Sequence, residues 1–416
     1  MHHFTYRNAQ FYAEDVPLAD LAAAYGTPTY VYSAATLRRH YDVLDEALAG
    51  AAHTICFAVK ANSNLAVLQL LAQRGAGFDI VSAGELQRVI LAGGDPGKVV
   101  FSGVGKRDDE IALALRHSIL ALHVESEGEL LRIEHVAAQL GVRAPVSLRV
   151  NPQVDPKTHK YIATGLATSK FGVDMRSAPA LYRRAAASPH LRVVGIGSHI
   201  GSQILELQPM IEAVAKVLDL VHRLRAEGIP LHHLDIGGGI GIPYRDEDTV
   251  TPADFGQAIT ALVAPHGLHL ITEPGRVIAG NAGILLTRVI GTKQNGNRNF
   301  IIVDAAMNDL LRPALYGAWH GIVPVQQQDR PEHVVDVVGP VCESGDFLAQ
   351  DRLMPAVETG ELLAVLAAGA YGFAMSSNYN SRPRACELLV DGASVHEARR
   401  REDSSDLCKG EALRPV

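Results

Sequence analysis

The sequence has few cysteines, no long apolar run and no excess of basic residues. Four cysteines in 416 residues, with no paired metal-ligand spacing, argue against a disulfide framework and favour a reducing, intracellular compartment. The longest apolar run, 362–375, holds two glycines and is too short to cross a bilayer, so we expect a buried strand and its turn there. The N-terminal stretch lacks a basic segment followed by an apolar one, so no signal peptide is expected.

The charge balance excludes a further class of partner. The net charge is −7, whereas phosphate-backbone binding needs a basic face, so nucleic acid is disfavoured. With 47% hydrophobic and 20% charged residues, the composition is that of an ordinary globular protein. We therefore predict a cytoplasmic protein with no membrane partner, no nucleic-acid partner and no metal. At 416 residues, two domains are expected.

One theme repeats from about residue 50 to 285: a short apolar run, a turn and an amphipathic stretch. Eight such runs begin near residues 54, 77, 99, 120, 146, 193, 231 and 269. Apolar strands that alternate with helices indicate a parallel sheet covered by helices, and eight units over this length favour a closed (β/α)8 barrel of the TIM type. The wider gap after Asn151 predicts an insertion at the barrel mouth.

The character changes after about residue 285. β-rich segments separated by Gly, Pro and Asn turns predict a mostly antiparallel β-sandwich or β-barrel domain. The early segment TPTYVYS is predicted to form a strand that belongs to this β domain. We therefore predict a barrel domain at 35–284, and a β domain built from 1–34 and 285–416. The charged tail from His396 reads as a solvated helix or a frayed end.

Reactive groups of such barrels gather at the carboxyl ends of the strands. Lys60 closes the first run, ICFAVK. A lysine at a strand end is usually a charge that reaches solvent, but a buried lysine at a barrel mouth loses stability in its charged form and becomes an amine able to bind a carbonyl group covalently.

A glycine triplet, Gly237, Gly238 and Gly239, follows the seventh run. Such a triplet is often only a turn, but bare backbone also lets amide N–H groups converge on an anion. Barrel phosphate sites commonly use the loops after strands seven and eight, and Gly275-Arg276 follows the eighth. These two loops together predict a phosphate site.

Glu273 and His199 complete the set of strand-end residues. Glu273 could simply pair with Arg276, or it could keep a pyridine nitrogen protonated so that the ring accepts electrons. His199 could be a structural histidine, or it could lie flat against a cofactor ring. An amine, a phosphate site and a carboxylate partner for a ring nitrogen in one barrel mouth predict pyridoxal phosphate as the cofactor.

Four motifs now identify a resemblance that covers nearly the whole chain. FAVKAN, SHIGSQ, DIGGGIGI and EPGR resemble those of the fold-type III pyridoxal-phosphate decarboxylases, whose barrel and β domain are alanine-racemase-like, and within them those of the bacterial diaminopimelate decarboxylases. The four motifs are shared with ornithine and arginine decarboxylases, so they indicate cofactor and fold rather than substrate. The resemblance also implies that Asp79 and Ser202 bind the cofactor.

Other stretches carry the substrate assignment. By resemblance, Arg312 and Tyr316 in MNDLLRPALYGAWH bind a distal carboxylate together with Arg276, and Tyr371 in GAYGFAMSSNYN lies near phosphate and substrate. The segment THKYIATGLATSKFGV resembles one near the substrate's far end. Two small departures from the family pattern, Ala374 where serine is common and Cys386 in the last strand, put nothing important in doubt.

The motif GPVCESGD carries Cys342 and Glu343. The resemblance implies that Cys342 protonates the reacting carbon, although a free cysteine is commonly only a small buried hydrophobe. Glu343 would bind the distal ammonium. The resemblance further implies a homodimer in which both residues reach the partner subunit's site.

The predicted reaction is the decarboxylation of meso-2,6-diaminopimelate to L-lysine and CO2, the last step of lysine biosynthesis. Meso-diaminopimelate has a second amino-acid head, which arginines can bind bidentately, whereas with ornithine buried arginines would lack their carboxylate. Alternatives are a decarboxylase for another basic amino acid or for carboxynorspermidine, an alanine racemase, and a non-catalytic carrier of the cofactor. Racemases need a tyrosine opposite the lysine, and carriers resemble the barrel alone.

Overall fold

The structure is a computed structural model that describes residues 2–155 and 169–414. It divides into two compact units. We call Arg38–Pro243 with Glu247–Ile278 the barrel unit, and Met1–Leu37 with Tyr244–Asp246 and Ala279–Val416 the sheet unit. The domain boundaries given from the sequence stay a prediction.

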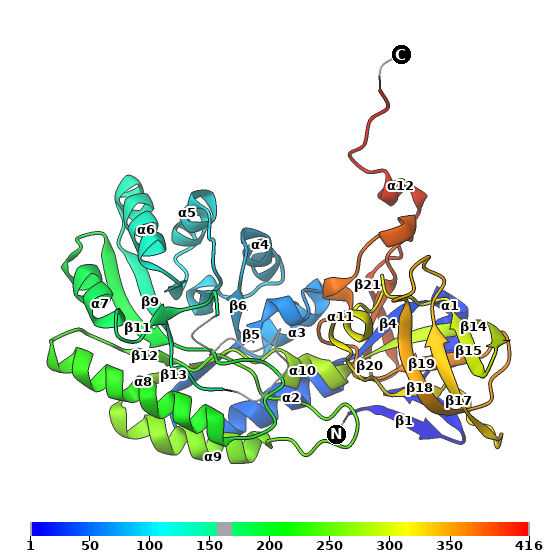
Figure 1. Ribbon diagram of the computed structural model, residues 1–416. Coiled ribbons are helices and arrows are strands. Elements are labelled where there is room, and N and C mark those ends of the chain that lie inside the picture. Colours follow the sequence, from blue (N-terminus) through cyan, green and yellow to red (C-terminus); the bar gives the residue numbers. More distant parts are fainter. Residues whose placement is uncertain (1, 156–168, 415–416) are drawn as a thin grey trace. The chain divides into compact units, whose positions relative to one another are not determined.

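Eight parallel strands close the barrel unit (Figure 1). The last pairs with the first and the fourth with the fifth, so no edge is left between them. The two-residue strand β10 (Val173–Asp174) pairs alongside β9. The predicted closed barrel is confirmed. The barrel strands are β5 (His53–Ala58), β6 (Gly77–Ile80), β7 (Val99–Phe101), β8 (Ala121–Val124), β9 (Ala144–Asn151), β11 (Leu191–Gly197), β12 (His233–Asp235) and β13 (His269–Thr272).

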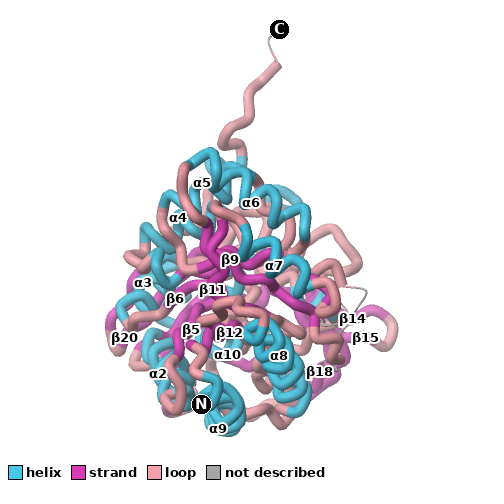
Figure 2. The backbone as a smooth tube through the Cα atoms, turned by 90° about the vertical axis from the view of Figure 1, so that its left-hand side faces the viewer, coloured by secondary structure: helices cyan, strands magenta, loops and turns pink. Residues whose placement is uncertain are grey.

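Helices surround these strands, as Figure 2 shows. Residues of β6, β7, β8 and β9 are buried without alternation, because the barrel interior covers one face of each strand and helices cover the other. Serine side chains start two of the helices: Ser82 accepts from the Glu85 amide and Ser126 from the Glu129 amide. The helices are α2 (Ala34–Leu48), α3 (Leu65–Gln73), α4 (Ala83–Leu91), α5 (Asp108–Arg116), α6 (Glu127–Leu140), α7 (Ala178–Ala187), α8 (Gln208–Ala226), α9 (Pro252–Val263) and α10 (Arg276–Ala279).

The sheet unit contains one large sheet and a three-stranded sheet, β1-β2-β3. The large sheet runs β18-β17-β15-β14-β4-β20-β21, with β19 pairing β14 and β16 pairing β19. It is mostly antiparallel, as predicted; β15–β17 and β20–β4 are parallel. The early strand β4 thus lies between β14 and β20. The elements are β1 (Phe4–Arg7), β2 (Gln10–Ala13), β3 (Val16–Pro17), α1 (Leu18–Tyr25), β4 (Thr29–Ser33), β14 (Gly283–Asn295), β15 (Arg298–Val303), α11 (Arg312–Tyr316), β16 (Ile322–Pro324), β17 (Glu332–Val338), β18 (Phe347–Pro355), β19 (Leu362–Val365), β20 (Cys386–Asp391), β21 (Ser394–Arg399) and α12 (Ser404–Leu407).

The C-terminal tail departs from the prediction. His396 lies within strand β21, antiparallel to β20, rather than in a solvated helix or a frayed end. The Arg399 guanidinium pairs with the buried carboxylate of Glu387 at 2.5 Å, which explains why a charged segment stays in the sheet. Helix structure begins only at α12.

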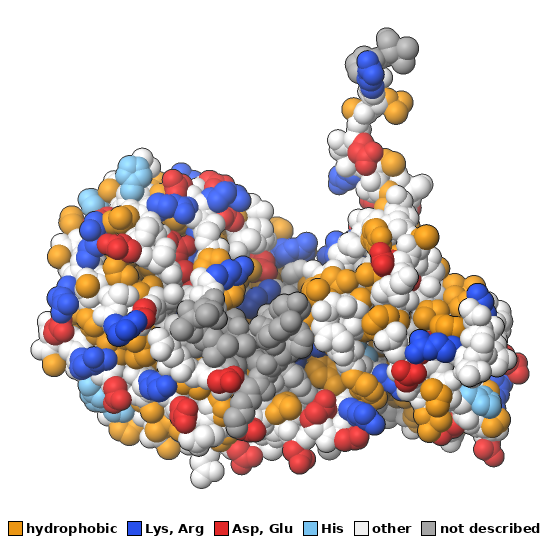
Figure 3. Space-filling view, in the orientation of Figure 1, with side chains coloured by type: hydrophobic (Ala, Val, Ile, Leu, Met, Phe, Trp, Pro, Cys, Tyr) orange, Lys and Arg blue, Asp and Glu red, His pale blue; other side chains and the backbone are white. Residues whose placement is uncertain are grey.

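The surface of the chain is mixed in charge. On the face drawn in Figure 3, Lys and Arg side chains are interspersed with Asp and Glu. Among the described residues, no helix has both the length and the apolar character needed to cross a membrane.

Candidate active site

Lys60 follows the end of β5, in a single 3-10 turn (Val59–Ala61). Its Nζ lies 2.5 Å from Oδ2 of Asp79, which is fully buried on β6. Burial raises the pKa of Asp79, and the nearby Glu273 raises it further, while Lys60 opposes the shift. The Lys60 side chain is 37% exposed, so its surroundings are set by the partner carboxylate more than by the desolvation expected from the sequence.

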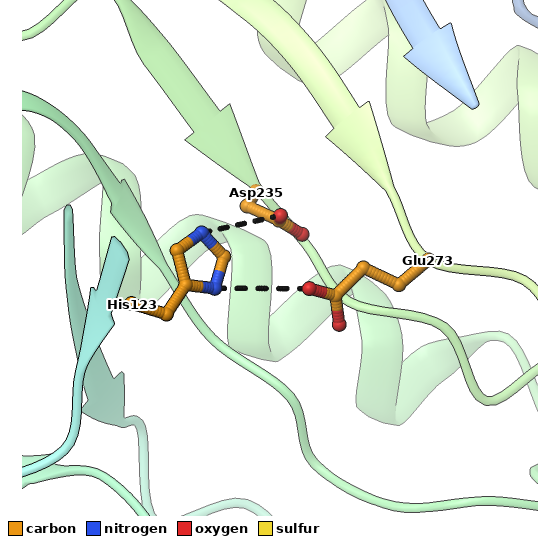
Figure 4. Close-up of side chains that lie close together, drawn as sticks. All are labelled: His123, Asp235 and Glu273. Carbon is orange, nitrogen blue, oxygen red and sulfur yellow. Dashed lines mark ion pairs between the residues drawn. The ribbon is translucent and has the colours of Figure 1, made fainter. Parts of the chain in front are cut away.

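Glu273 follows β13 and is buried. Its Oε1 accepts a hydrogen bond from the Ser102 hydroxyl at 3.1 Å and lies 3.7 Å from Nδ1 of His123. On the far side of that imidazole, Nε2 lies 3.5 Å from Oδ2 of Asp235. Figure 4 shows this arrangement, in which the histidine of β8 stands between the carboxylates that end β12 and follow β13. The sequence had predicted only Glu273 of these four residues.

The glycine triplet is held by the protein itself. Gly237 and Gly239 have φ angles of 68° and 108°, which favour glycine. The Gly237 amide donates to Oδ1 of Asp235 at 2.8 Å, and the Gly238 amide donates to Nδ1 of His199 at 3.2 Å. Two of the three amides thus have partners within the barrel unit, and cofactor binding by the triplet stays a prediction. The carboxylate that ends β12 folds back to satisfy the turn, and the histidine after β11 takes the next amide.

His199 is thereby placed beside the glycine loop. Burial lowers its pKa well below the usual value, and the positive charges of Arg149 and Lys60 add to the effect. The ring is therefore neutral near pH 7. Because its Nδ1 accepts from Gly238, its proton is on Nε2.

Arg276 opens the short helix α10, directly after Gly275. Its side chain is buried, and its guanidinium donates to the Ser202 hydroxyl at 3.0 Å. A buried guanidinium beside a hydroxyl at a helix start suits a phosphate group. The barrel unit thus brings the predicted residues Lys60, Asp79, His199, Ser202, Gly237, Gly238, Gly239, Glu273, Gly275 and Arg276 to the carboxyl ends of its strands.

The other predicted residues belong to the sheet unit. Arg312 starts α11 and is buried; its guanidinium donates to Nε2 of His320 at 2.8 Å and lies 4.6 Å from the ring centre of Tyr244. His320 is held in turn by the Leu366 carbonyl, 2.8 Å from its Nδ1. Tyr316 ends the same helix and is half-buried.

Cys342 and Glu343 are exposed within the sheet unit. The Cys342 amide donates to Oδ1 of Asn380 at 2.8 Å, which fixes the loop backbone. Tyr371 is half-buried and has a positive φ of 57°. Of the segment predicted to lie near the substrate's far end, residues 158–168 lie outside the described residues.

Comparison with known proteins identifies the family. Residues 34–280 match the model of the pyridoxal-binding domain of pyridoxal-dependent decarboxylases. The chain is 55% identical to a diaminopimelate decarboxylase of Pseudomonas aeruginosa over 99% of both chains, and 53% identical to one of Vibrio cholerae over the full length of both. The chain belongs to the diaminopimelate decarboxylase family. Its fold matches the crystal structure of diaminopimelate decarboxylase from Helicobacter pylori complexed with L-lysine, with a TM-score of 0.92 and 44% identity over 94% of this chain and 98% of the other.

Diaminopimelate decarboxylases are pyridoxal-phosphate enzymes, and the geometry of the barrel unit suits that cofactor. Oδ1 of Asp79 is a buried oxygen with no hydrogen-bond partner among the described residues, although it stands next to the amine of Lys60. A buried acceptor without a donor is costly unless a ligand brings one. The pyridoxal ring carries a hydroxyl group, so it offers a donor of this kind.

Five residues of the site went unpredicted. Each lies at or just beyond the carboxyl end of a barrel strand, in the apolar runs that begin near residues 99, 120, 146 and 231. Their position at strand ends is the signal that could have identified them. The five are Ser102, His123, Glu125, Arg149 and Asp235.

We predict that Gly238→Ala disrupts this site. An added Cβ would lie 2.1 Å from the Glu273 carbonyl oxygen, so the glycine loop and Glu273 must separate. We expect the affinity for pyridoxal phosphate to fall by about 100-fold or more, because both the glycine loop and Glu273 would be displaced. Absorbance titration of the apoprotein with pyridoxal phosphate measures this.

The matched control is Gly128→Ala in α6, where an added Cβ meets no atom within 4 Å. Its cofactor affinity should equal that of the parent chain. Equal affinities for both variants would contradict the close approach of the glycine loop to Glu273.

Proposed function

We propose that this chain decarboxylates meso-2,6-diaminopimelate to L-lysine and CO2 as the last step of lysine biosynthesis, with the residues at the carboxyl ends of its barrel strands as the cofactor site. The observation that carries the proposal is the convergence of Lys60, Asp79 and Glu273 on one end of the barrel. When bound, pyridoxal phosphate supplies an electron sink for the electron pair that remains when CO2 leaves.

The barrel residues divide this work. Lys60 holds the cofactor through its amine, and the Asp79 carboxylate beside it orients the amine and keeps a proton at hand. Glu273 holds a proton on the ring nitrogen. His199, a neutral ring fixed by the Gly238 amide, would pack against the cofactor ring. Arg276 binds the phosphate and reaches toward the substrate.

The remaining barrel residues shape the phosphate site. Ser202 already accepts a hydrogen bond from Arg276, and its own hydroxyl proton can go to a phosphate oxygen. Gly275 leaves room at the start of α10. Gly237 and Gly238 contribute close backbone approach, and Gly239 contributes an amide, since no hydrogen bond from that amide occurs in the described part of the chain.

Arg276, Arg312 and Tyr316 are the proposed ligands of the distal carboxylate, with Glu343 for the distal ammonium and Tyr371 near substrate and phosphate. The assignment of Arg312 rests on how firmly its guanidinium is held. His320 accepts one of its N–H groups, and the Tyr244 ring covers the guanidinium. A guanidinium fixed on two sides loses little entropy on binding a carboxylate, and it can do so through two parallel hydrogen bonds.

The proposed substrate is tested by comparing kcat/KM on meso-diaminopimelate, L-ornithine and L-arginine, with lysine and CO2 assayed as products of the first. We expect meso-diaminopimelate to be preferred by about 1,000-fold or more, because the other two lack the distal carboxylate that the arginines bind. A preference for ornithine or arginine would overturn the substrate assignment while leaving the cofactor assignment intact.

For Arg312→Ala we predict mainly weaker substrate binding. KM for meso-diaminopimelate should rise by about 10- to 100-fold, the value of one charged hydrogen-bonded contact, with a smaller change in kcat. Steady-state kinetics measure both. Arg298→Ala is the control, because this arginine is largely exposed and pairs with Asp336 on neighbouring strands of the same sheet. An unchanged KM in Arg312→Ala would contradict the assignment.

We further propose a homodimer in which Cys342 and Glu343 of one subunit complete the site of the other, with Cys342 as the proton donor to the reacting carbon. Both side chains are exposed in the single chain, while the loop backbone is fixed by Asn380. An exposed but ordered thiol and carboxylate suit a role toward a second chain. A cytoplasmic location stays a prediction.

Mixing two inactive variants tests the shared site. Lys60→Ala and Cys342→Ala should each lose most activity alone, while Cys342→Ala still binds pyridoxal phosphate. After subunit exchange at equal amounts, about a quarter of the parental activity should return, because half of the dimers are mixed and each mixed dimer has one intact site. The control mixes Lys60→Ala with Cys408→Ala, because the exposed thiol of Cys408 has no proposed role. Before exchange, the active Cys408→Ala dimers alone should give this mixture about half of the parental activity. No recovery in the first mixture would contradict a shared site.

A further inference from the structure

Behind Glu273, three side chains form a buried group that the proposed function has not used. Ser102, His123 and Asp235 are each less than 5% exposed and come from the ends of β7, β8 and β12. Ser102 Oγ lies 3.1 Å from both Oε1 of Glu273 and Nδ1 of His123. The imidazole therefore links the hydroxyl on one side to the Asp235 carboxylate on the other (Figure 4).

The hydrogen positions in this group follow from donor and acceptor counting. An ionised Glu273 only accepts, so the single hydroxyl proton of Ser102 goes to it, and Ser102 then accepts from Nδ1–H of His123. In a neutral imidazole this leaves a lone pair on Nε2, which faces Oδ2 of Asp235 at 3.5 Å.

Asp235 completes the group. Its Oδ1 accepts from the Gly237 amide, while its Oδ2 is buried and has no hydrogen-bond partner among the described residues. Two lone pairs facing each other would repel. One proton between Oδ2 and Nε2 removes that repulsion, and the Asp235–His123 pair then has no net charge.

We propose that Ser102, His123 and Asp235 are positioning residues that hold Glu273 ionised and fixed through Oε1, so that its other oxygen, Oε2, takes the proton of the pyridine nitrogen. The inference rests on the proposed function, in which Glu273 is the partner of that nitrogen. The hydrogen bond from Ser102 goes to Oε1 and not to Oε2. The glycine loop belongs to the same hydrogen-bonded group, because Asp235 accepts a hydrogen bond from the Gly237 amide.

The charges around the group explain why it is needed. Asp79, Asp235 and Glu273 are three buried carboxylates, and together they cannot all stay ionised without compensation. Burial, and then the charge of Glu273, raise the pKa of Asp235 well above its usual value. Burial lowers the pKa of His123 to about 4, with Lys106 and Arg149 adding to this while Asp79 and Glu125 oppose it. The extra proton therefore belongs on Asp235, between its Oδ2 and Nε2 of His123.

The test reads the protonation of the cofactor rather than turnover alone. The protein is loaded with pyridoxal phosphate labelled with 15N in the ring, and the 15N chemical shift reports whether the nitrogen carries a proton. In Ser102→Ala and His123→Leu we expect bound cofactor with a shift toward the unprotonated form. We also expect kcat to fall about 10- to 100-fold with KM little changed, as for one lost hydrogen bond to a charged group.

Asp235→Asn is the informative conservative variant. Its amide oxygen can still accept from Gly237 while its NH2 donates to Nε2 of His123, so it imitates the protonated acid. The ring nitrogen should stay protonated in this variant. If Asp235→Asn loses ring protonation while Ser102→Ala keeps it, the proposed hydrogen positions are wrong. Ser147→Ala is the control, because this equally buried barrel serine makes no hydrogen bond to the group in the described part of the chain.

Two further measurements separate the ways in which the proposal can fail. Glu273→Gln should itself remove the proton from the ring nitrogen; a parental shift there would overturn the proposed function of Glu273. A shift change in Glu273→Gln, together with parental shifts in Ser102→Ala and His123→Leu, would overturn only the positioning group. If His123→Leu does not fold, the 15N shift of Ser102→Ala alone tests the positioning group.

A metal ion is the competing occupant of this group. The ligand atoms of His123, Asp235 and Glu273 lie within 4.8 Å of one another, a spacing that could hold an ion. Elemental analysis of the purified protein should find no stoichiometric divalent metal. One metal ion per chain that is lost in His123→Leu would overturn the proposal.

Discussion

Mutual repulsion among three buried carboxylates is the constraint around which the barrel unit is organised. Asp79, Asp235 and Glu273 lie at the carboxyl ends of β6, β12 and β13, where closure of the barrel brings the strand ends into one ring. Each carboxylate is compensated differently. Asp79 pairs with the amine of Lys60, Asp235 lies 3.5 Å from Nε2 of His123, and Glu273 accepts a hydrogen bond from Ser102. Three like groups thereby acquire three different partners.

The backbone of the site depends on the same carboxylates. Asp235 fixes the glycine loop through Gly237, and the Glu273 amide donates to the Gly237 carbonyl at 2.8 Å, so the loop is tied to both strands. Gly238 packs so closely against Glu273 that a side chain has no room. The glycine triplet therefore packs tightly between β12 and β13, whatever part it takes in binding an anion.

The sequence predicted the architecture well because its signals are local. Eight apolar runs gave the eight barrel strands, and TPTYVYS was assigned to a strand before the barrel. Lys60, His199 and Glu273 could be predicted as site residues because each lies at or just beyond the end of a barrel strand. The group behind Glu273 was missed because its members have no motif: Ser102, His123 and Asp235 are single residues in separate runs, and only the barrel register makes them neighbours. The tail beyond His396 was mispredicted because its charge pattern does not reveal the buried Glu387 that pairs with Arg399.

Borohydride reduction of the cofactor-loaded protein tests the central claim most directly, because it fixes pyridoxal phosphate covalently to the amine that holds it. Peptide mass spectrometry should find the cofactor on Lys60, the amine that pairs with Asp79. The informative competitor is Lys106, a second lysine of the barrel unit, which is buried and bound to the backbone carbonyls of Gly103 and His123. Cofactor on Lys106, or on any lysine other than Lys60, would contradict the account.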